Sequence, residues 1–301
     1  MPTVRWNGGA GTGVVSTAAN WEGGAVPAVD DIAIIASTDY DLSGTFTNKP
    51  AELHITGGWR GRNIGSVGTA LAIAAVAGTV TLIKITGTDA LELCHISAGS
   101  SNTLTLATID DPGNGPVVFS GGGTISTLRH GTRGTVVIET NVTLTNAKIG
   151  GRAVLVCKPI GTATGIVTLK VDPAAKAILE RALVATTGRA DINGLLQFQG
   201  APTAGLSMGA NSLIVVNNGG TLQYAAKPPT SGNTFAEVSI GAGGRFTPQG
   251  AYESFTVDIL ESYRGAIIEE RAGSVEVTFT TRRPIGIPVG FTAAPAGAPV
   301  V

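Results

Sequence analysis

Residues 79–109 read TVTLIKITGTDALELCHISAGSSNTLTLATI. Within this stretch, three short runs rich in Thr, Val, Ile and Leu (TVTLIKI, ALELCHI and TLTLATI) are separated by segments that contain Gly, Asp, Asn or Ser. β-Branched residues favour strands, and Gly and Asn supply the backbone conformations that tight turns need. The stretch therefore predicts three strands joined by short turns.

Runs of the same kind recur from residue 52 to residue 280, at a spacing near the ~8–12 residues of all-β architectures. Many of them are apolar at consecutive positions, Thr is abundant, and aromatic residues make up only 5% of the chain. Small and β-branched side chains fill the narrow core of a solenoid well, and turns of variable length can extend its coils. We expect an all-β chain folded as a right-handed parallel β-helix (a solenoid), with a β-sandwich as the alternative.

One segment departs from this pattern. Residues 172–188 read DPAAKAILERALVATTG, with Asp172 placed to cap a helix, Pro173 at its first position and Gly188 after its end. The segment predicts a short helix that covers the solenoid, and the alternative is another pair of strands.

The two ends of the chain differ in composition from the middle. Residues 1–50 are rich in Gly, Ala and Thr and contain two of the three tryptophans, whereas residues 282–301 are apolar and rich in proline. Proline at high density favours an extended segment. We therefore divide the chain into an N-terminal capping or attachment module (1–50), a β-solenoid (51–281) and an extended arm (282–301) that contacts a neighbouring subunit.

The charge balance argues against several classes of partner. Twenty basic residues against 21 acidic ones give a net charge of −1, so the chain lacks the basic surface that nucleic acid requires. No apolar run approaches the ~20 residues of a membrane-spanning helix, and the first residues do not resemble a signal peptide. Only 14% of the residues are charged, which leaves a large surface poorly solvated. We expect the chain to be made in the cytoplasm, and that surface to be covered by copies of the chain or by another assembly.

Motifs for chemistry are sparse. A G-x-S-x-G match at 205–209 lacks the flanking strand and helix of a nucleophile elbow, and the glycine loop at 11–16 lacks a dinucleotide-binding context. Cys94 and Cys157 have the surroundings of buried apolar residues, and Cys94 and His95 should point to opposite faces of a strand. The carboxylates considered for glycan hydrolysis, which needs two of them about 5–9.5 Å apart, are Asp110, Asp111, Asp172, Glu180, Asp191, Glu269 and Glu270. Few aromatic residues accompany them, so we expect no enzyme and no catalytic, cofactor-binding or metal-binding residues.

Residues 4–36 read VRWNGGAGTGVVSTAANWEGGAVPAVDDIAIIA. This segment resembles the W-x-G-G…T-A-A-N-W-x-G-G-x-x-P opening of phage virion proteins and of some large β-helical surface proteins. The matching positions include Trp6, Asn20, Trp21, Pro27 and Asp31. The resemblance covers about a tenth of the chain and identifies an opening module, in which Trp6 and Trp21 could plug the end of a solenoid.

Among phage structural proteins, the chain resembles capsid decoration (cement) proteins most. That resemblance implies a homotrimer that binds the major capsid protein on the capsid exterior, with no cofactor, nucleic acid or membrane. The alternative is a tail-fibre or head-fibre module that binds, and in some cases cleaves, host polysaccharide. The residues that we expect to contact the capsid or a neighbouring subunit are Trp6, Trp21, Arg282, Arg283, Pro284, Ile287 and Phe291.

Overall fold

The structure is a computed structural model that describes residues 1–36, 38–57, 59, 62–66, 68–73, 78–87, 91–113, 115–158, 166–180, 188–200, 211–226, 234–249, 254–272 and 275–285. The chain divides into two compact units, Met1–Thr162 and Ala163–Val301. The fold is an all-β parallel solenoid of about nine turns, which confirms the predicted fold class and excludes the sandwich. The only helices among the described residues are two short 3-10 turns, η1 (Ala18–Asn20) and η2 (Glu22–Gly24).

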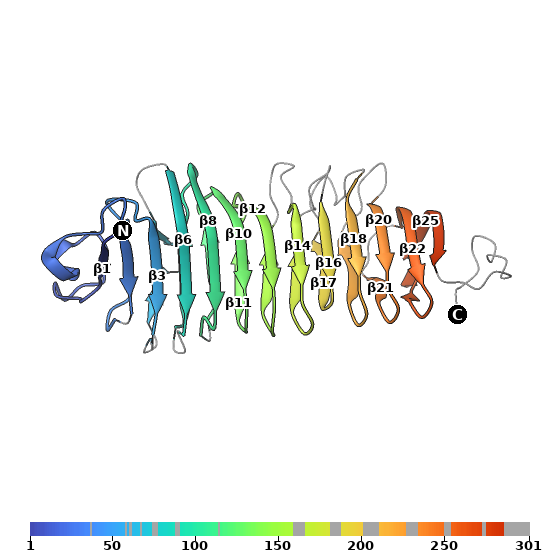
Figure 1. The fold of residues 1–301 in the computed structure, drawn as a ribbon, viewed down its shortest axis with the longest axis horizontal. Helices are drawn as coiled ribbons and strands as arrows, with labels where there is room; N and C mark the ends of the chain where they lie inside the picture. Colours follow the sequence, from blue (N-terminus) through green and yellow to red (C-terminus); the bar gives the residue numbers. More distant parts are fainter. Residues whose placement is uncertain are drawn as a thin grey trace. The chain divides into compact units, whose positions relative to one another are not determined.

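Each turn of the first unit contributes one strand to a large sheet and, from β4 onward, a second strand to a smaller sheet. The large sheet has the order β1-β2-β3-β6-β8-β10-β12, and the smaller one β13-β11-β9-β7-β4, with β5 also paired to β7. Figure 1 shows β6, β8, β10 and β12 lying side by side. Their bounds are β1 (Thr3–Arg5), β2 (Ile32–Ile35), β3 (Glu52–Thr56), β4 (Asn63–Ile64), β5 (Leu71–Ala72), β6 (Gly78–Thr86), β7 (Leu93–Ser97), β8 (Asn102–Asp110), β9 (Val117–Ser120), β10 (Thr124–His130), β11 (Thr135–Ile138), β12 (Thr143–Ile149) and β13 (Val154–Cys157).

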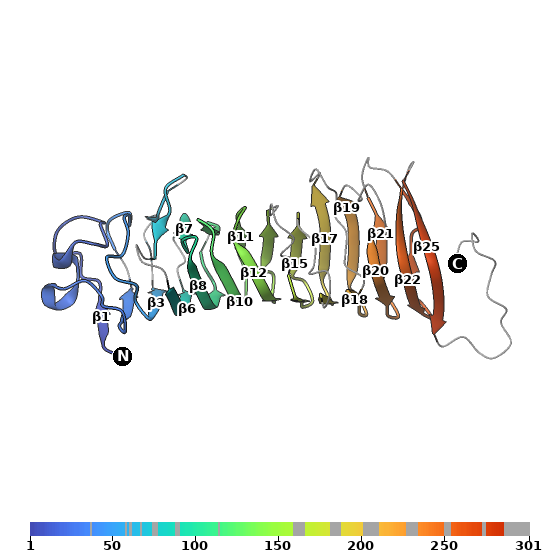
Figure 2. The ribbon, with the colours of Figure 1, turned by 90° about the horizontal axis from the view of Figure 1, so that it is seen from above.

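The second unit repeats this plan. Its sheets have the orders β14-β16-β18-β20-β22-β25-β24 and β15-β17-β19-β21-β23, and Figure 2 shows β17, β19 and β21 in a layer opposite β18, β20 and β22. The strands are β14 (Thr168–Val171), β15 (Lys176–Leu179), β16 (Arg189–Ile192), β17 (Leu195–Gly200), β18 (Leu213–Val216), β19 (Thr221–Ala226), β20 (Phe235–Ile240), β21 (Arg245–Pro248), β22 (Phe255–Tyr263), β23 (Ile267–Ile268), β24 (Arg271–Ala272) and β25 (Val275–Ile285). The β24–β25 pair is antiparallel, whereas the other strand pairs described in this unit are parallel.

In the first unit, parallel pairing stacks like residues above one another inside the large sheet. Ile35 pairs with Ile55, Ile55 with Ile85, and Ile85 with Ile109, and all four are fully buried. The next position is His130, and Ile149 follows it. We call these six residues the isoleucine column. Burying an Ile side chain stabilises a fold by about 1.5–3 kcal/mol, so the column is a major part of this core.

The second unit fills its interior partly with aromatic rings. Phe198, Tyr224 and Phe246 come from the smaller sheet, and Phe235, Phe255 and Phe279 come from the large one. Their ring centroids lie 4.5–6.4 Å apart in a connected set of contacts. We call these six rings the aromatic cluster, and it joins the two sheets of the second unit.

The predicted helix at 172–188 is wrong where the structure describes it. Pro173 and Ala174 form a turn, with Ala174 at φ +64°, and Lys176–Leu179 form strand β15. Ala175, Ala177 and Leu179 are buried, while Lys176 and Ile178 are less so, which is the period-two alternation of a strand. The segment has helix-forming residues, but pairing with Leu195–Phe198 of β17 gives it the strand conformation. Residues 181–187 lie outside the described residues.

The described chain contains no helix that is long and apolar enough to cross a membrane.

Candidate functional site

The residues of the N-terminal motif hold their own module together. Asn20 is fully buried; its side-chain oxygen accepts from the Ala10 N–H at 3.0 Å, and its amide group donates to Thr12 Oγ1 and to the Val14 carbonyl. The Trp21 indole N–H donates to the Val15 carbonyl at 2.8 Å. The motif thus fixes the glycine-rich loop against the start of the solenoid.

The two tryptophans expected as contact residues lie in the interior of this module. Trp6 is 8% exposed and Trp21 is 1% exposed, and their rings meet edge to face with centroids 5.2 Å apart. Trp21 also packs against Phe46 at 5.8 Å. This packing suits a plug in the module, and it leaves the two rings little surface to offer a partner.

Exposed apolar side chains instead lie near the two ends of the described chain. Among the described residues, no large hydrophobic side chain between 41 and 262 is exposed. The exposed ones are Met1, Val14, Val29 and Tyr40 in the N-terminal module, and Tyr263 and Ile267 near the end of the second unit.

The basic pair before the proline-rich segment is held by acidic residues of the same chain. Arg282 lies in β25, 2.6 Å from Glu270 and above the Phe279 ring, 4.8 Å from its centroid. Arg283 lies 3.5 Å from Glu261. Pro284 is exposed and also belongs to β25, so the strand extends past the start of the predicted arm at 282. Ile287 and Phe291 lie outside the described residues.

Most carboxylates considered for glycan hydrolysis lie beside a cation. Apart from the partly buried pair of Glu270 and Arg282, such surface pairs contribute about 0–1 kcal/mol each to stability. The described residues contain no group of three or more His, Cys, Asp or Glu residues that could hold a metal ion. The ion pairs are Asp111 with Arg133, Asp172 with Lys170 (3.7 Å), Asp191 with Arg189 (2.8 Å), Glu269 with Arg245 (3.2 Å) and Glu270 with Arg282 (2.6 Å).

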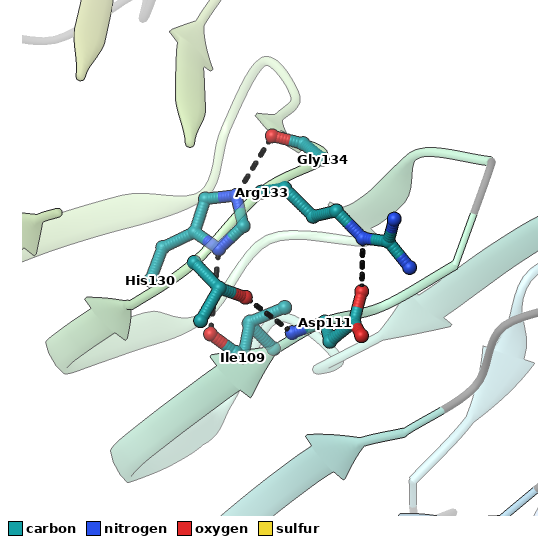
Figure 3. A network of polar contacts seen from close by, with 6 residues as sticks. Ile109, Asp111, His130, Arg133 and Gly134 are labelled. Atoms are coloured by element: carbon teal, nitrogen blue, oxygen red, sulfur yellow. Dashed lines mark hydrogen bonds and ion pairs between the residues drawn. The ribbon is translucent and has the colours of Figure 1, made fainter. Parts of the chain in front are cut away.

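Figure 3 shows a polar network around His130, the one polar member of the isoleucine column. His130 is 1% exposed; its Nε2 lies 3.0 Å from the Gly134 carbonyl oxygen and its Nδ1 lies 3.4 Å from that of Ile109. Burial lowers the pKa of His130 below its ordinary value, although the two carbonyls and the charge of Asp110 act in the opposite direction. The neutral ring can donate to only one of these carbonyls at a time.

The two cysteines are buried and free, as predicted. Burial raises the pKa of the Cys94 thiol, so this group is a poor nucleophile. Cys94 is fully buried while its neighbour His95 is only half-buried on the outer side of β7, which confirms that the two side chains point to opposite faces.

The outer face of the smaller sheet in the first unit carries a depression of about 600 Å³. Its lining includes His95 from β7, Ser120 from the end of β9, and Gly121 and Gly122 directly after it. His95 Nε2 lies 2.8 Å from Ser120 Oγ, and His95 Nδ1 lies 2.8 Å from the Ser66 carbonyl oxygen. We call this group the His95–Ser120 site.

The sequence analysis missed this site because it assigned no repeat length. Parallel pairing sets His95 beside Val118 and Ser97 beside Ser120, so the coil length at this point is 23 residues. Ser120 is 25 residues after His95, which brings it to the next coil two positions farther along. The sequence signal that could have indicated this site is a histidine followed, about one coil length later, by a serine.

The second unit has a more polar depression of about 630 Å³ on its smaller sheet. Residues on β15, β19 and β21, including Lys176, Gln223 and Arg245, contribute to its lining. No aromatic residue is among those that line it, although rings are usual where proteins stack on sugars. The other serine motif, at 205–209, lies outside the described residues.

Comparisons with known proteins give no match: no protein-family model, no curated protein and no solved structure matches this chain. The function must therefore be argued from the fold and from its side chains.

Proposed function

We propose that this chain is a structural protein of a virion, a capsid decoration protein that binds the outer capsid surface as a homotrimer and stabilises the capsid. The observation that carries the proposal is the location of the exposed apolar side chains. In the described chain they lie in the N-terminal module and near the end of the second unit, and none lies between residues 41 and 262. Exposed apolar side chains are the groups that a partner surface would cover, and contiguous patches of them mark interaction sites.

The N-terminal module supports the proposal by its rigidity. Asn20 and Trp21 use their hydrogen-bonding groups within the module, so the loops around them are held in one conformation. A rigid surface loses less conformational freedom on binding than a flexible one. The contacts would then be made by the exposed neighbours Val14, Val29 and Tyr40 rather than by the two buried tryptophans.

These exposed apolar side chains are few, and a single copy would bind weakly. A trimer that touches several capsid subunits converts weak contacts into strong attachment, because the second and third contacts form at a high effective concentration. The low charge of the chain, 14% of its residues, also suits a surface that is covered in an assembly.

The test is immunogold electron microscopy of particles from the source, combined with sedimentation of purified chain with those particles. Label spread over icosahedral heads supports the proposal. Label confined to tails or fibres supports the polysaccharide-binding alternative, and particles without label contradict both.

A matched pair of variants shows whether the N-terminal module makes the contact. The double change Val29→Asp and Tyr40→Asp replaces two exposed apolar side chains with charged ones. It should reduce co-sedimentation at least tenfold. The control, Thr105→Asp, changes an exposed residue of β8 and should leave co-sedimentation unchanged. Equal binding by both variants would remove the N-terminal module from the interface.

A further inference from the structure

The His95–Ser120 site has the arrangement of a nucleophilic hydroxyl beside a general base. A serine hydroxyl attacks a carbonyl carbon when a nearby imidazole accepts its proton, and this needs about 2.6–3.2 Å between oxygen and nitrogen. The 2.8 Å between Ser120 Oγ and His95 Nε2 falls in this range.

The backbone fixes which nitrogen of His95 carries the proton. A carbonyl oxygen only accepts hydrogen bonds, so the Nδ1–H donates to the Ser66 carbonyl at 2.8 Å. In the neutral ring Nε2 then has a free lone pair and accepts from the Ser120 hydroxyl. The Ser66 carbonyl therefore orients the ring, as a third group does in serine hydrolases.

The glycines after Ser120, Gly121 and Gly122, line the same depression. Gly121 and Gly122 have φ near +80°, a conformation that glycine adopts readily, and a Cβ at Gly121 would collide with the Ser97 hydroxyl. Among the described residues, neither of these two N–H groups donates to a backbone carbonyl. Main-chain N–H groups beside a nucleophile can stabilise the oxyanion of a tetrahedral intermediate, and these two are not committed to a backbone carbonyl of the described chain.

We propose that the His95–Ser120 site hydrolyses small carboxylic esters through an acyl-serine intermediate. Ser120 Oγ forms a bond to the ester carbonyl carbon while its proton moves to His95 Nε2. The tetrahedral intermediate then breaks its bond to the alcohol oxygen, which leaves with the proton from His95. Water attacks the acyl-serine in the second half, with His95 again accepting and returning the proton, so that the carboxylic acid and the free serine result.

The lining of the depression defines the kind of ester. Leu93 and Val118 supply apolar surface, and Glu139 and Asn141 lie at its polar side. An open depression of about 600 Å³ accommodates a short acyl chain on an alcohol that extends into solvent. This activity goes beyond the proposed structural role and does not depend on it.

The test uses the full chain with two probes, a fluorophosphonate that labels activated serines and p-nitrophenyl acetate as a small ester. We expect one fluorophosphonate adduct, mapped to Ser120 by mass spectrometry, and ester hydrolysis that the adduct abolishes. Ser120→Ala should remove both. His95→Gln should slow labelling and hydrolysis by about 10²-fold or more, the usual contribution of a general base.

Ser239→Ala is the matched control, because Ser239 is a serine of β20 that is half-buried like Ser120 but does not line the depression. It should keep both labelling and hydrolysis within about twofold of the unchanged chain, and circular dichroism should show that all three variants fold. An unlabelled Ser120, or a labelling rate that His95→Gln leaves unchanged, would overturn the proposal. Neither of these results would bear on attachment to particles.

Discussion

The isoleucine column of the first unit and the aromatic cluster of the second unit fill the same kind of coil in different ways. The column stacks residues of one sheet, each in contact with the equivalent residue of the next coil. The cluster takes rings from both sheets. The ring of Phe235, for example, contacts the rings of Phe198, Tyr224 and Phe255. A column distributes its stabilisation along the solenoid, whereas a cluster concentrates it, so single substitutions should have unequal effects in the two regions.

The largest effect is expected from Phe235→Ala. Phe235 is fully buried, and removing its ring should lower the free energy of unfolding by about 3–5 kcal/mol, as measured by urea denaturation. Phe119→Ala is the matched control, because Phe119 is fully buried in the first unit and has no ring partner among the described residues. Each ring pair adds about 0.5–1.5 kcal/mol beyond its burial, so Phe235→Ala should be the more harmful change. Equal losses would mean that the cluster gains nothing from its ring contacts.

The next effect concerns the polar member of the column. Because burial lowers the pKa of His130, the folded chain takes up its proton at lower pH than the unfolded chain does. The contribution of His130 to the free energy of unfolding should therefore be constant above the ordinary histidine pKa of about 6.5 and fall as the pH drops below it. Urea denaturation between pH 7.5 and 5 measures this dependence.

His130→Leu separates the proton effect from packing. Leucine continues the apolar column but removes the hydrogen bond from the ring to the Gly134 carbonyl, which still accepts from the Val154 N–H at 2.9 Å. The loss of that one hydrogen bond costs about 0.5–1.5 kcal/mol at pH 7.5. Two charged groups lie near the ring. The negative charge of Asp110 favours the protonated form of His130, and the Asp111–Arg133 pair lies at the adjacent turn. The variant should lose the part of the acid sensitivity that begins near pH 6.5. An unchanged pH dependence would assign that sensitivity to other groups.

The sequence predicts the strands better than it predicts their alignment. Runs such as TVTLIKI, which forms most of β6, identify themselves by their β-branched residues and their flanking turns. The segment around Lys176–Leu179 misleads because its residues favour a helix in isolation, and only the partner strand β17 decides its conformation. Local propensity is informative where no partner contradicts it.

The candidate site needs the alignment that the sequence alone does not provide. Ser66, His95 and Ser120 are brought together because three consecutive coils stack in register, and the intervening turns differ in length. A shift of one residue in the pairing register of β9 would move Ser120 to the opposite face of its strand. For the same reason, the column position of His130 becomes visible only when Ile109 and Ile149 are found beside it.

The smallest effect is expected at the end of the second unit, where an arginine occupies the position that pairs with Leu260. Arg282 covers the cluster ring Phe279 and binds Glu270, and its side chain is 28% exposed. Arg282→Ala should lower the free energy of unfolding by about 1 kcal/mol, the sum of a partly buried ion pair and a cation–π contact. Arg283→Ala, whose side chain is 53% exposed and pairs with Glu261 at 3.5 Å, should change it by less than about 0.5 kcal/mol. If the two variants unfold at the same urea concentration, Arg282 does not stabilise the end of the aromatic cluster, and ring packing alone accounts for the stability of that end.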